Sequence, residues 1–348
     1  SARPEAMAPA RRDLAALPKA ELHLHLEGAM RPSTLAELCK KHGISCPADT
    51  RGQRFPDFGP FAACYMAVCE CLRDEEDLFR LVREVAEDAA ASGALWIEPA
   101  LSVGLYAERF GGLEGALEVL LRAAVAAEAA TGVAMGFIVA AERHLPPAEA
   151  EVLAQAVRAM VERGAAVVNG RLGIVAFGLH SAEPGNPPEP FAKAFEIACV
   201  GGVVAVPHAG ELPPATGEGP AGVRFCVDHI GARRIEHGVL AMEDEDLVAH
   251  LAAKGVCLDV CPTSNYLLRV VEELADHPLP KLLRAGVPCS INSDDPLMFG
   301  SSLLEEFVLC RGTLGLSDED LAACARTSFV HSCAPGALKS RGVAGVDS

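Results

Sequence analysis

The sequence lacks any long apolar run and is short of basic residues. No stretch approaches about 18 uninterrupted apolar residues, so we expect neither a transmembrane helix nor a membrane partner. Its 30 Lys and Arg stand against 47 Asp and Glu, which gives a formal net charge of −17. Nucleic-acid binding depends on Lys and Arg that neutralise phosphates, so this charge argues against nucleic acid as a partner and favours a small neutral or cationic ligand.

Signatures of a disulfide framework are also missing. The 13 cysteines are odd in number and are scattered from Cys39 to Cys333 without a Cys-x-x-Cys pair. Residues 1–12 mix Pro, Ala and Arg without an apolar segment, which is not typical of a secretory signal. We therefore expect reduced thiols and a cytoplasmic location. We also predict that residues 1–13 are a disordered, tag-like segment and that residues 14–348 form one domain.

Hairpin signals are absent, and short apolar strands alternate instead with amphipathic helices. Strands that are apolar along their whole length are typical of a sheet buried on both faces. Eight strand–helix units predict a (β/α)₈ barrel, which typically takes about 250 residues and often more, with an open doubly wound sheet as the alternative. Residues 44–62 are predicted to be irregular, either a lid or pocket wall or plain packing. Extra helices are expected after the first strand, and two helices are expected to close the chain. The predicted strands lie around His23 and His25 and at 94–101, 133–140, 173–179, 203–207, 234–239, 256–260 and 287–292.

Two histidines alternate with leucines near the start of the chain. The stretch 20–28 reads Ala-Glu-Leu-His-Leu-His-Leu-Glu-Gly. In a strand, residues two apart point to the same side, so His23 and His25 face one way. Paired neutral imidazoles indicate half of a metal site, although two satisfied core histidines would give the same pattern.

The other polar residues gather at predicted strand ends. His208 and Glu211 follow the fifth strand, His237 lies in the sixth, and Asp294 and Asp295 follow the eighth. In a barrel, the C-terminal ends of all strands surround one axial cup. Three His and one Asp with an open position suit a catalytic divalent ion, and we predict one zinc per chain. The predicted zinc ligands are His23, His25, His208 and Asp294.

Two further residues suit acid–base chemistry. A bound metal ion lowers the pKa of its water from 15.7 to about 7. His237 is placed to accept the proton of that water or to hold the hydroxide, and Glu211, three residues past a ligand, suits a general acid or base. The histidines interpreted as structural or solvated are His42, His144, His229, His250, His277 and His331.

These motifs resemble those of the adenosine/adenine deaminase family of the amidohydrolase superfamily, over residues 14–335. The resemblance implies a (β/α)₈ barrel with one zinc, whose ligands fall on the four residues predicted above. The runs that carry it are Pro18-Lys-Ala-Glu-Leu-His-Leu-His-Leu-Glu-Gly28, His208-Ala-Gly-Glu211, Arg234-Ile-Glu-His-Gly238, Cys261-Pro-Thr-Ser-Asn265 and Ser293-Asp-Asp-Pro296.

The resemblance also implies a reaction, the hydrolytic deamination of an adenine-type ring. Hydroxide attacks the carbon that bears the exocyclic amine, and ammonia leaves. Glu211 would protonate the neighbouring ring nitrogen, His237 would stabilise and deprotonate the attacking water, and Asp295 would hydrogen-bond a further ring nitrogen. The predicted substrate contacts are Glu27, Gly28, Ser181, Glu183, Asp295, Phe58 and Phe61.

Several alternatives stay open at this point. Adenosine, free adenine and an extended derivative such as aminodeoxyfutalosine are all candidates, whereas AMP is disfavoured because no basic cluster awaits a phosphate. A non-purine amidohydrolase is more remote, since residues 165–183 hold no lysine to bridge two metals. Zinc deaminases with a Pro-Cys-x-x-Cys motif are disfavoured because Pro288-Cys289 lacks the second Cys. A protein that kept the fold but is not an enzyme is a further functional alternative. The oligomeric state is also open, with a homodimer as one possibility.

Overall fold

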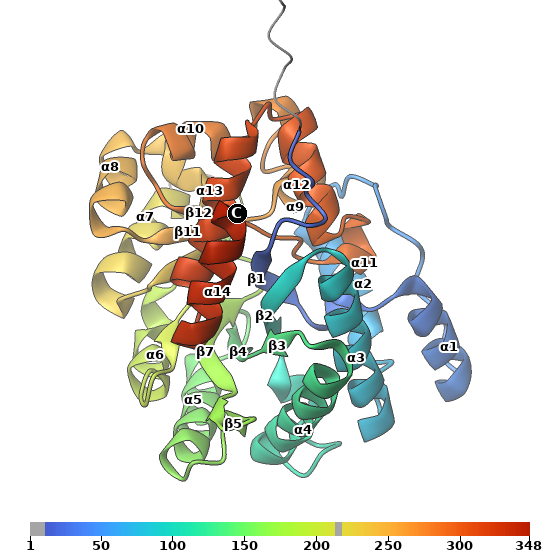
Figure 1. Cartoon of the computed structure of the whole chain (residues 1–348). Helices are drawn as coiled ribbons and strands as arrows, with labels where there is room; N and C mark the ends of the chain where they lie inside the picture. Colours follow the sequence, from blue (N-terminus) through green and yellow to red (C-terminus); the bar gives the residue numbers. More distant parts are fainter. Residues whose placement is uncertain (1–10, 213–217) are drawn as a thin grey trace, which may run out of the picture.

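The computed structural model describes residues 11–212 and 218–348, in which parallel strands form a barrel surrounded by helices (Figure 1). The eight predicted strands are confirmed as the barrel strands. The fifth is interrupted at Pro207, which has no N–H to donate, and a short hairpin of β5 (Val167–Val168) and β6 (Arg171–Leu172) lies outside the barrel. The barrel strands are β1 (Lys19–His25), β2 (Ala94–Leu101), β3 (Ala134–Met135) with β4 (Phe137–Glu142), β7 (Ile174–His180), β8 (Val204–Ala205) with β9 (His208–Ala209), β10 (Arg234–His237), β11 (Cys257–Val260) and β12 (Cys289–Ile291).

The barrel closes between its first strand and the segment after its last one. Strands β1, β2, β4, β7 and β8 pair in that order, and β9, β10, β11 and β12 continue it. Leu24 and Asp294 form a parallel bridge. The His25 N–H donates to the Asp294 carbonyl at 2.9 Å, and the Asp294 N–H donates to the His23 carbonyl at 3.2 Å. Closure therefore brings Asp294 beside both histidines of β1.

The helices cover the outside of the barrel, and two predictions about them were wrong. Residues 58–62, predicted to be irregular, begin α2, because the Asp57 side chain accepts a hydrogen bond from the Gly59 N–H and caps the helix. Four helices rather than two follow the last strand, since capping boxes at Ser302 and Ser317 start new helices. The helices are α1 (Pro32–His42), α2 (Phe58–Cys69), α3 (Glu75–Ala91), α4 (Leu113–Thr131), α5 (Pro147–Glu162), α6 (Ala192–Ala198), α7 (Glu218–Phe225), α8 (Glu245–Lys254), α9 (Pro262–Leu267), α10 (Leu279–Arg284), α11 (Pro296–Phe299), α12 (Leu303–Gly312), α13 (Asp318–His331) and α14 (Gly336–Asp347).

The two ends of the described chain meet beside β1. The Arg12 guanidinium donates to the Val346 carbonyl of α14 at 2.6 Å, and Arg311 of α12 donates to the Arg12 carbonyl at 2.7 Å. Of the predicted N-terminal segment 1–13, residues 1–10 lie outside the described residues.

All 13 cysteines are free thiols, as predicted. Within 11–212 and 218–348, no helix combines the length and the apolar character needed to span a bilayer.

A buried arginine links three barrel strands below the polar cup. Arg234 on β10 is fully buried, and its guanidinium lies 2.7 Å from Glu98 of β2 and 2.7 Å from Asp259 of β11. Trp96 and Ser290 donate further hydrogen bonds to these two carboxylates, each at 2.7 Å. One guanidinium therefore serves two buried carboxylates, and the neutral donors Trp96 and Ser290 hydrogen-bond the same two groups, which is the support that buried charges need in a dry interior.

Arg234→Leu is expected to lower the free energy of unfolding by about 3–5 kcal/mol, because two buried carboxylates lose their counter-ion. Urea denaturation followed by circular dichroism measures the change. The matched control is Arg83→Leu, since Arg83 is half exposed and lies 3.6 Å from Glu87. That change should stay within about 0.5 kcal/mol. Equal effects of the two substitutions would contradict the role given to Arg234.

Candidate active site

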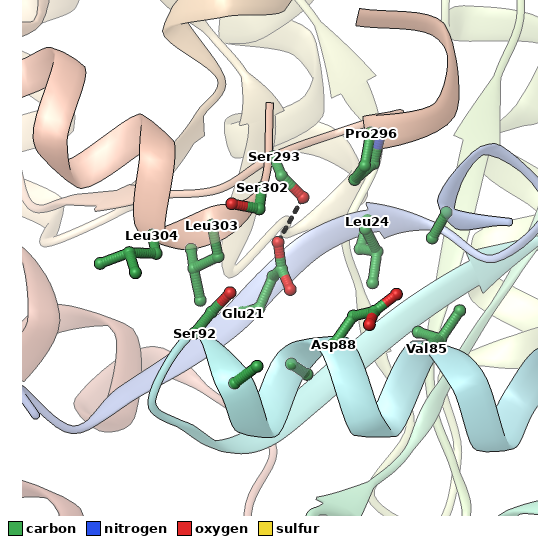
Figure 2. Close-up of a pocket in the computed structure, with 13 residues that line it drawn as sticks. Glu21, Leu24, Val85, Asp88, Ser92, Ser293, Pro296, Ser302, Leu303 and Leu304 are labelled. Atoms are coloured by element: carbon green, nitrogen blue, oxygen red, sulfur yellow. Dashed lines mark hydrogen bonds between the residues drawn. The ribbon is translucent and has the colours of Figure 1, made fainter. Parts of the chain in front are cut away.

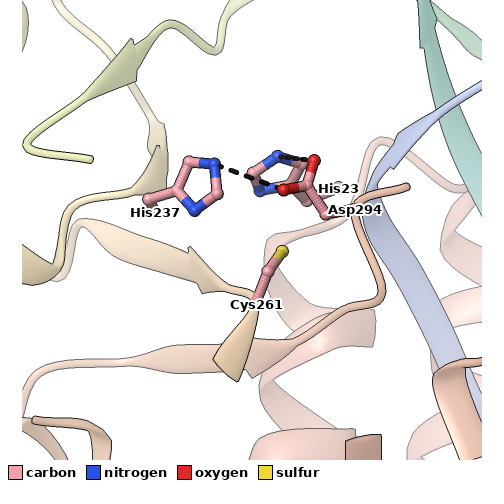
Figure 3. A group of neighbouring side chains, drawn as sticks. All are labelled: His23, His237, Cys261 and Asp294. Atoms are coloured by element: carbon pink, nitrogen blue, oxygen red, sulfur yellow. Dashed lines mark ion pairs between the residues drawn. The ribbon is translucent and has the colours of Figure 1, made fainter. Parts of the chain in front are cut away.

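The residues predicted to carry chemistry lie at the C-terminal ends of the barrel strands. His23 and His25 come from β1, His208 from β9 and His237 from β10, while Asp294 follows β12. Figure 3 shows that His23, His237 and Asp294 point toward one another, with Cys261 on the same side. Segments far apart in the sequence thus supply one cup, as the barrel prediction requires.

Three strand ends here share an unusual backbone conformation. Ser181, His237 and Asp294 have φ values of 79°, 63° and 62°. Positive φ is uncommon in residues that carry a Cβ, and it persists where the surrounding structure enforces it, often at functional sites. The cup is therefore built on backbone that the fold holds in place against its local preference.

The four predicted metal ligands lie together. Asp294 Oδ1 is 3.3 Å from Nε2 of His23 and 3.3 Å from Nε2 of His25. Ligand atoms of these three residues and His208 all lie within 4.8 Å of one another. His23 Nε2 and Asp294 Oδ1 are buried without a hydrogen-bond partner, although buried polar atoms are normally paired. Unpaired donor atoms this close together can hold a cation between them.

Neighbouring groups orient two of these ligands. The His23 Nδ1–H donates to the backbone carbonyl of Asp259 at 2.9 Å, which leaves the Nε2 lone pair free for a metal. Glu236 Oε2 lies 2.7 Å from His208 Nδ1. The Arg143 guanidinium donates to the backbone carbonyl of His208, so the backbone of this ligand is fixed as well. Such outer contacts set the direction of a metal-binding imidazole.

The protonation states of His208 and Asp294 suit metal binding as they stand. At the two β1 histidines the facing carboxylates outweigh burial and raise the pKa, that of His23 to about 9 and that of His25 well above its usual value, so these two release a proton when an ion binds. Burial and the nearby His23 lower the pKa of His208 well below its usual value, so this imidazole is neutral. Burial alone would raise the pKa of Asp294, but the facing His23 and His25 hold it well below its usual range. A neutral imidazole and an ionised carboxylate are the forms that bind a metal ion.

Glu211 is held beside this cluster by another glutamate. The carboxylate of Glu183 accepts the backbone N–H groups of Gly210, Glu211 and Leu212 at 2.7, 2.9 and 3.3 Å. Glu211 Oε1 lies 3.4 Å from His237 Nε2. Burial, followed by repulsion from Asp294, raises the pKa of Glu211 to about 8. Glu211 therefore carries a proton near neutral pH and can donate it.

The other predicted substrate contacts include Glu27 and Gly28, which follow the first strand. Both oxygens of Glu27 accept hydrogen bonds from tyrosines, Tyr106 and Tyr65, each at 2.9 Å. A Cβ on Gly28 would stand 1.7 Å from Asp295 Oδ1, so only glycine allows Asp295 this position.

Ser181 and the two predicted phenylalanines lie further out. The Ser181 hydroxyl pairs with His144 Nδ1 at 3.0 Å. Phe61 is buried and stacks on Phe299 with 5.4 Å between ring centroids, while Phe58 is partly exposed at the start of α2. These two side chains lie in an aromatic cluster that reaches the cup through Tyr65, whose ring centroid is 5.9 Å from that of His25.

Two residues of the cup were missed by the sequence analysis. The ring of His180 lies 4.6 Å from that of His25 and 4.7 Å from that of His208, between centroids. Its position as the last residue of β7 was the available signal, since the same position identified the other candidates. Tyr65 was missed because it lies on a helix whose docking against the cup has no local sequence pattern.

A separate cavity of about 290 Å³ lies between β1, α3 and α12 (Figure 2). Glu21 projects into it and accepts a hydrogen bond from Ser293 at 2.5 Å, and burial raises the pKa of Glu21 to about 7. The lining contains none of the four predicted ligands. The candidate active site is therefore defined by the converging ligand atoms and not by this cavity.

A parallel eight-stranded barrel with such a cup at its C-terminal face defines a hydrolytic enzyme with an amidohydrolase fold, a metal-dependent class. The family model described as adenosine deaminase matches residues 18–347. The chain therefore belongs to the adenosine deaminase family.

Relatives and solved structures agree with this family. A Streptomyces coelicolor protein provisionally described as an adenosine/adenine deaminase is 42% identical, over 97% of each chain. An aminodeoxyfutalosine deaminase of Acidothermus cellulolyticus is 35% identical, over 84% of this chain and 82% of that one. The crystal structure of an adenine deaminase from Arthrobacter aurescens superposes with a TM-score of 0.84 at 31% identity, and the match covers 95% of this chain and 98% of that chain.

Proposed function

We propose that this protein is a zinc-dependent aminohydrolase that replaces the 6-amino group of an adenine-type purine by oxygen and releases ammonia. The observation that carries the proposal is the cluster of His23, His25, His208 and Asp294, with a protonated Glu211 beside it. Relatives described as adenine, adenosine/adenine and aminodeoxyfutalosine deaminases support the choice of ring.

The donor set fits zinc. Three imidazole nitrogens and one carboxylate oxygen match its preference for N and O ligands. Asp294 Oδ1 lies at 3.3 Å from both histidine nitrogens of β1. When bound, the ion would supply a water-derived nucleophile at neutral pH.

The chain's own residues would hold the ring and move the protons. Glu211 donates its proton to the ring nitrogen beside the amine, which makes the adjacent carbon electrophilic. Asp295 is buried, and this burial raises its pKa well above the usual value, so it offers an O–H to a further ring nitrogen. His237 faces the same space and holds the attacking water. Preplaced groups of this kind act most strongly in a dry site.

Among the candidate substrates, one observation favours free adenine over adenosine. The resemblance implies that Glu27 replaces an aspartate that often contacts the sugar. Each oxygen of Glu27 already accepts a hydrogen bond, one from the partly exposed Tyr65 and one from the buried Tyr106. A ribose hydroxyl would have to share these oxygens with Tyr65 and Tyr106. Adenosine and an extended derivative are therefore the second candidates.

The test combines metal analysis with a substrate panel. Mass spectrometry of the purified protein should find one zinc per chain. The protein should also release ammonia from adenine, adenosine or an extended adenosine, which is followed by the loss of amino-purine absorbance. Two metals per chain, or activity only on non-purine rings, would identify a different amidohydrolase. A fully occupied metal site with no turnover of any purine would contradict an enzymatic role on this ring.

Gly28→Ala is expected to lower kcat/KM by about 10²-fold, because a displacement of about 1 Å in a catalytic group has that effect. The added Cβ would overlap Asp295 Oδ1 and push this carboxyl out of place. Steady-state kinetics on the best purine measures the change. Gly312→Ala at the end of α12 is the control, since nothing lies within 4 Å of its Cβ position. Parental kinetics in Gly28→Ala would mean that Asp295 does not align the substrate.

A further inference from the structure

We propose that a backbone N–H at the start of α10 sets the tautomer of His237, through the side chains of His277 and Asn265. The relay leaves the proton of His237 on Nε2, so that this residue enters the reaction as a hydrogen-bond donor. His277 and Asn265 are then positioning residues for the proposed deamination. The activity part of the test rests on that proposed function.

The relay consists of three successive hydrogen bonds. The Leu279 N–H donates to His277 Nδ1 at 3.1 Å, and His277 Nε2 lies 3.0 Å from Asn265 Oδ1. Asn265 Nδ2 lies 3.1 Å from His237 Nδ1. All three side chains are at most 2% exposed, so water does not compete with these contacts. The relay joins the start of α10, the short helix α9 and the end of β10.

The direction of the relay follows from the donor at its outer end. A backbone N–H can only donate, so His277 Nδ1 is an acceptor and carries no proton. Burial lowers the pKa of His277 to about 3, so the ring is neutral and its single proton lies on Nε2. That proton is donated to Asn265, and the atom that receives it must be the amide oxygen. The assignment of the Asn265 amide, which geometry alone leaves ambiguous, is thereby determined.

The same logic continues to His237. With its oxygen turned toward His277, Asn265 presents its amide nitrogen, which can only donate, to His237 Nδ1. His237 Nδ1 is therefore an acceptor. A ring that accepts a hydrogen bond at Nδ1 is not the doubly protonated cation, so its single proton lies on Nε2. The opposite tautomer would place two buried donors against each other at one of these contacts.

The consequence concerns the role of His237 in the cup. Its Nε2 lies 3.4 Å from Glu211 Oε1 and 3.8 Å from Asp294 Oδ2, and it has no hydrogen-bond partner among the described residues. An N–H there holds an oxygen atom by donating to it. The one lone pair of the ring faces Asn265, away from the cup, so Nε2 does not accept the proton of the attacking water. This assignment replaces the deprotonating role that the family resemblance implies for His237.

Three substitutions test the relay in the zinc-loaded enzyme. Asn265→Asp is isosteric but only accepts, so it should move the His237 proton to Nδ1 and lower kcat by about 10²-fold or more, as loss of a donor to a reacting oxygen does. His277→Gln keeps an N–H toward Asn265 and should retain the tautomer and kcat within a few-fold. His277→Leu removes that donor and should give a mixture of tautomers and a clear fall in kcat, with KM and zinc content unchanged.

The tautomer is read directly by two-bond ¹H–¹⁵N NMR on protein labelled at histidine nitrogens, with the His237 signals assigned through His237→Gln. Parental protein should show the Nε2–H form. An Nδ1–H form in the parental protein, or equal kcat in His277→Gln and His277→Leu, would overturn the proposal. The NMR measurement needs no substrate, so a failure of the deaminase proposal is seen separately, as an absence of purine turnover.

Discussion

Glu211→Gln is expected to retain the metal and to lose about 10²–10⁴-fold in kcat, the usual contribution of a general acid or base. Glu211 is buried, and its raised pKa of about 8 keeps it protonated near neutral pH. Glutamine has the same shape and can donate an N–H, but it cannot transfer a proton to the ring nitrogen. The loss should therefore appear in kcat, while KM and folding change little.

The matched control for this experiment is Glu306→Gln on α12. Glu306 is also fully buried, and burial raises its pKa to about 7, but it accepts a hydrogen bond from the Thr263 N–H at 3.2 Å and is not among the clustered acids of the cup. The same chemical change there should leave kcat near the parental value. If Glu211→Gln turned over substrate at the parental rate, the proton-donor role of Glu211 would be wrong.

Asp294→Ala is expected to abolish metal retention and, with it, the activity. Its carboxylate is the group that approaches both β1 histidines at 3.3 Å, and the change leaves only imidazole ligands. A bound ion also stabilises the fold, by about 2.7–4.1 kcal/mol when the free ion is at 100–1,000 times its Kd. Asp294→Ala should therefore unfold at lower urea concentration than the zinc-loaded parent and should no longer respond to added zinc.

Inductively coupled plasma mass spectrometry after dialysis measures the zinc that each variant retains. Urea denaturation with and without added zinc measures the change in stability. The control is His42→Ala, because His42, Asp74 and Asp77 form another group of possible ligands outside the cup, between the end of α1 and the start of α3. His42→Ala should keep one zinc per chain and the parental activity. Loss of the ion in His42→Ala but not in Asp294→Ala would place the metal outside the cup.

The sequence predicted the barrel and the candidate ligands for one physical reason. Residues of a barrel strand alternate between its two faces, and strand ends converge whatever the length of the connecting segments. The alternation of His23 and His25 and the strand-end positions of His208 and Asp294 were therefore readable without knowing any contact.

The residues that sequence reasoning missed depend on contacts between distant segments. Tyr65 reaches Glu27 only because α2 docks over the cup, and residues around its start were predicted to be irregular. Glu183 was expected at the substrate, yet its two oxygens are occupied by the backbone of the Glu211 loop. His277 was interpreted as structural, and only its three-dimensional neighbours connect it to His237.

The closure of the barrel has a mechanical consequence. The backbone of Asp294 joins the first strand through the carbonyl of His23 and the N–H of His25, so the seam of the barrel is made by three of the proposed metal ligands. A cation that ties their side chains together therefore also clamps this seam. Amide hydrogen exchange at His25 and Asp294, whose N–H groups make the two seam hydrogen bonds, is then expected to slow when zinc is added.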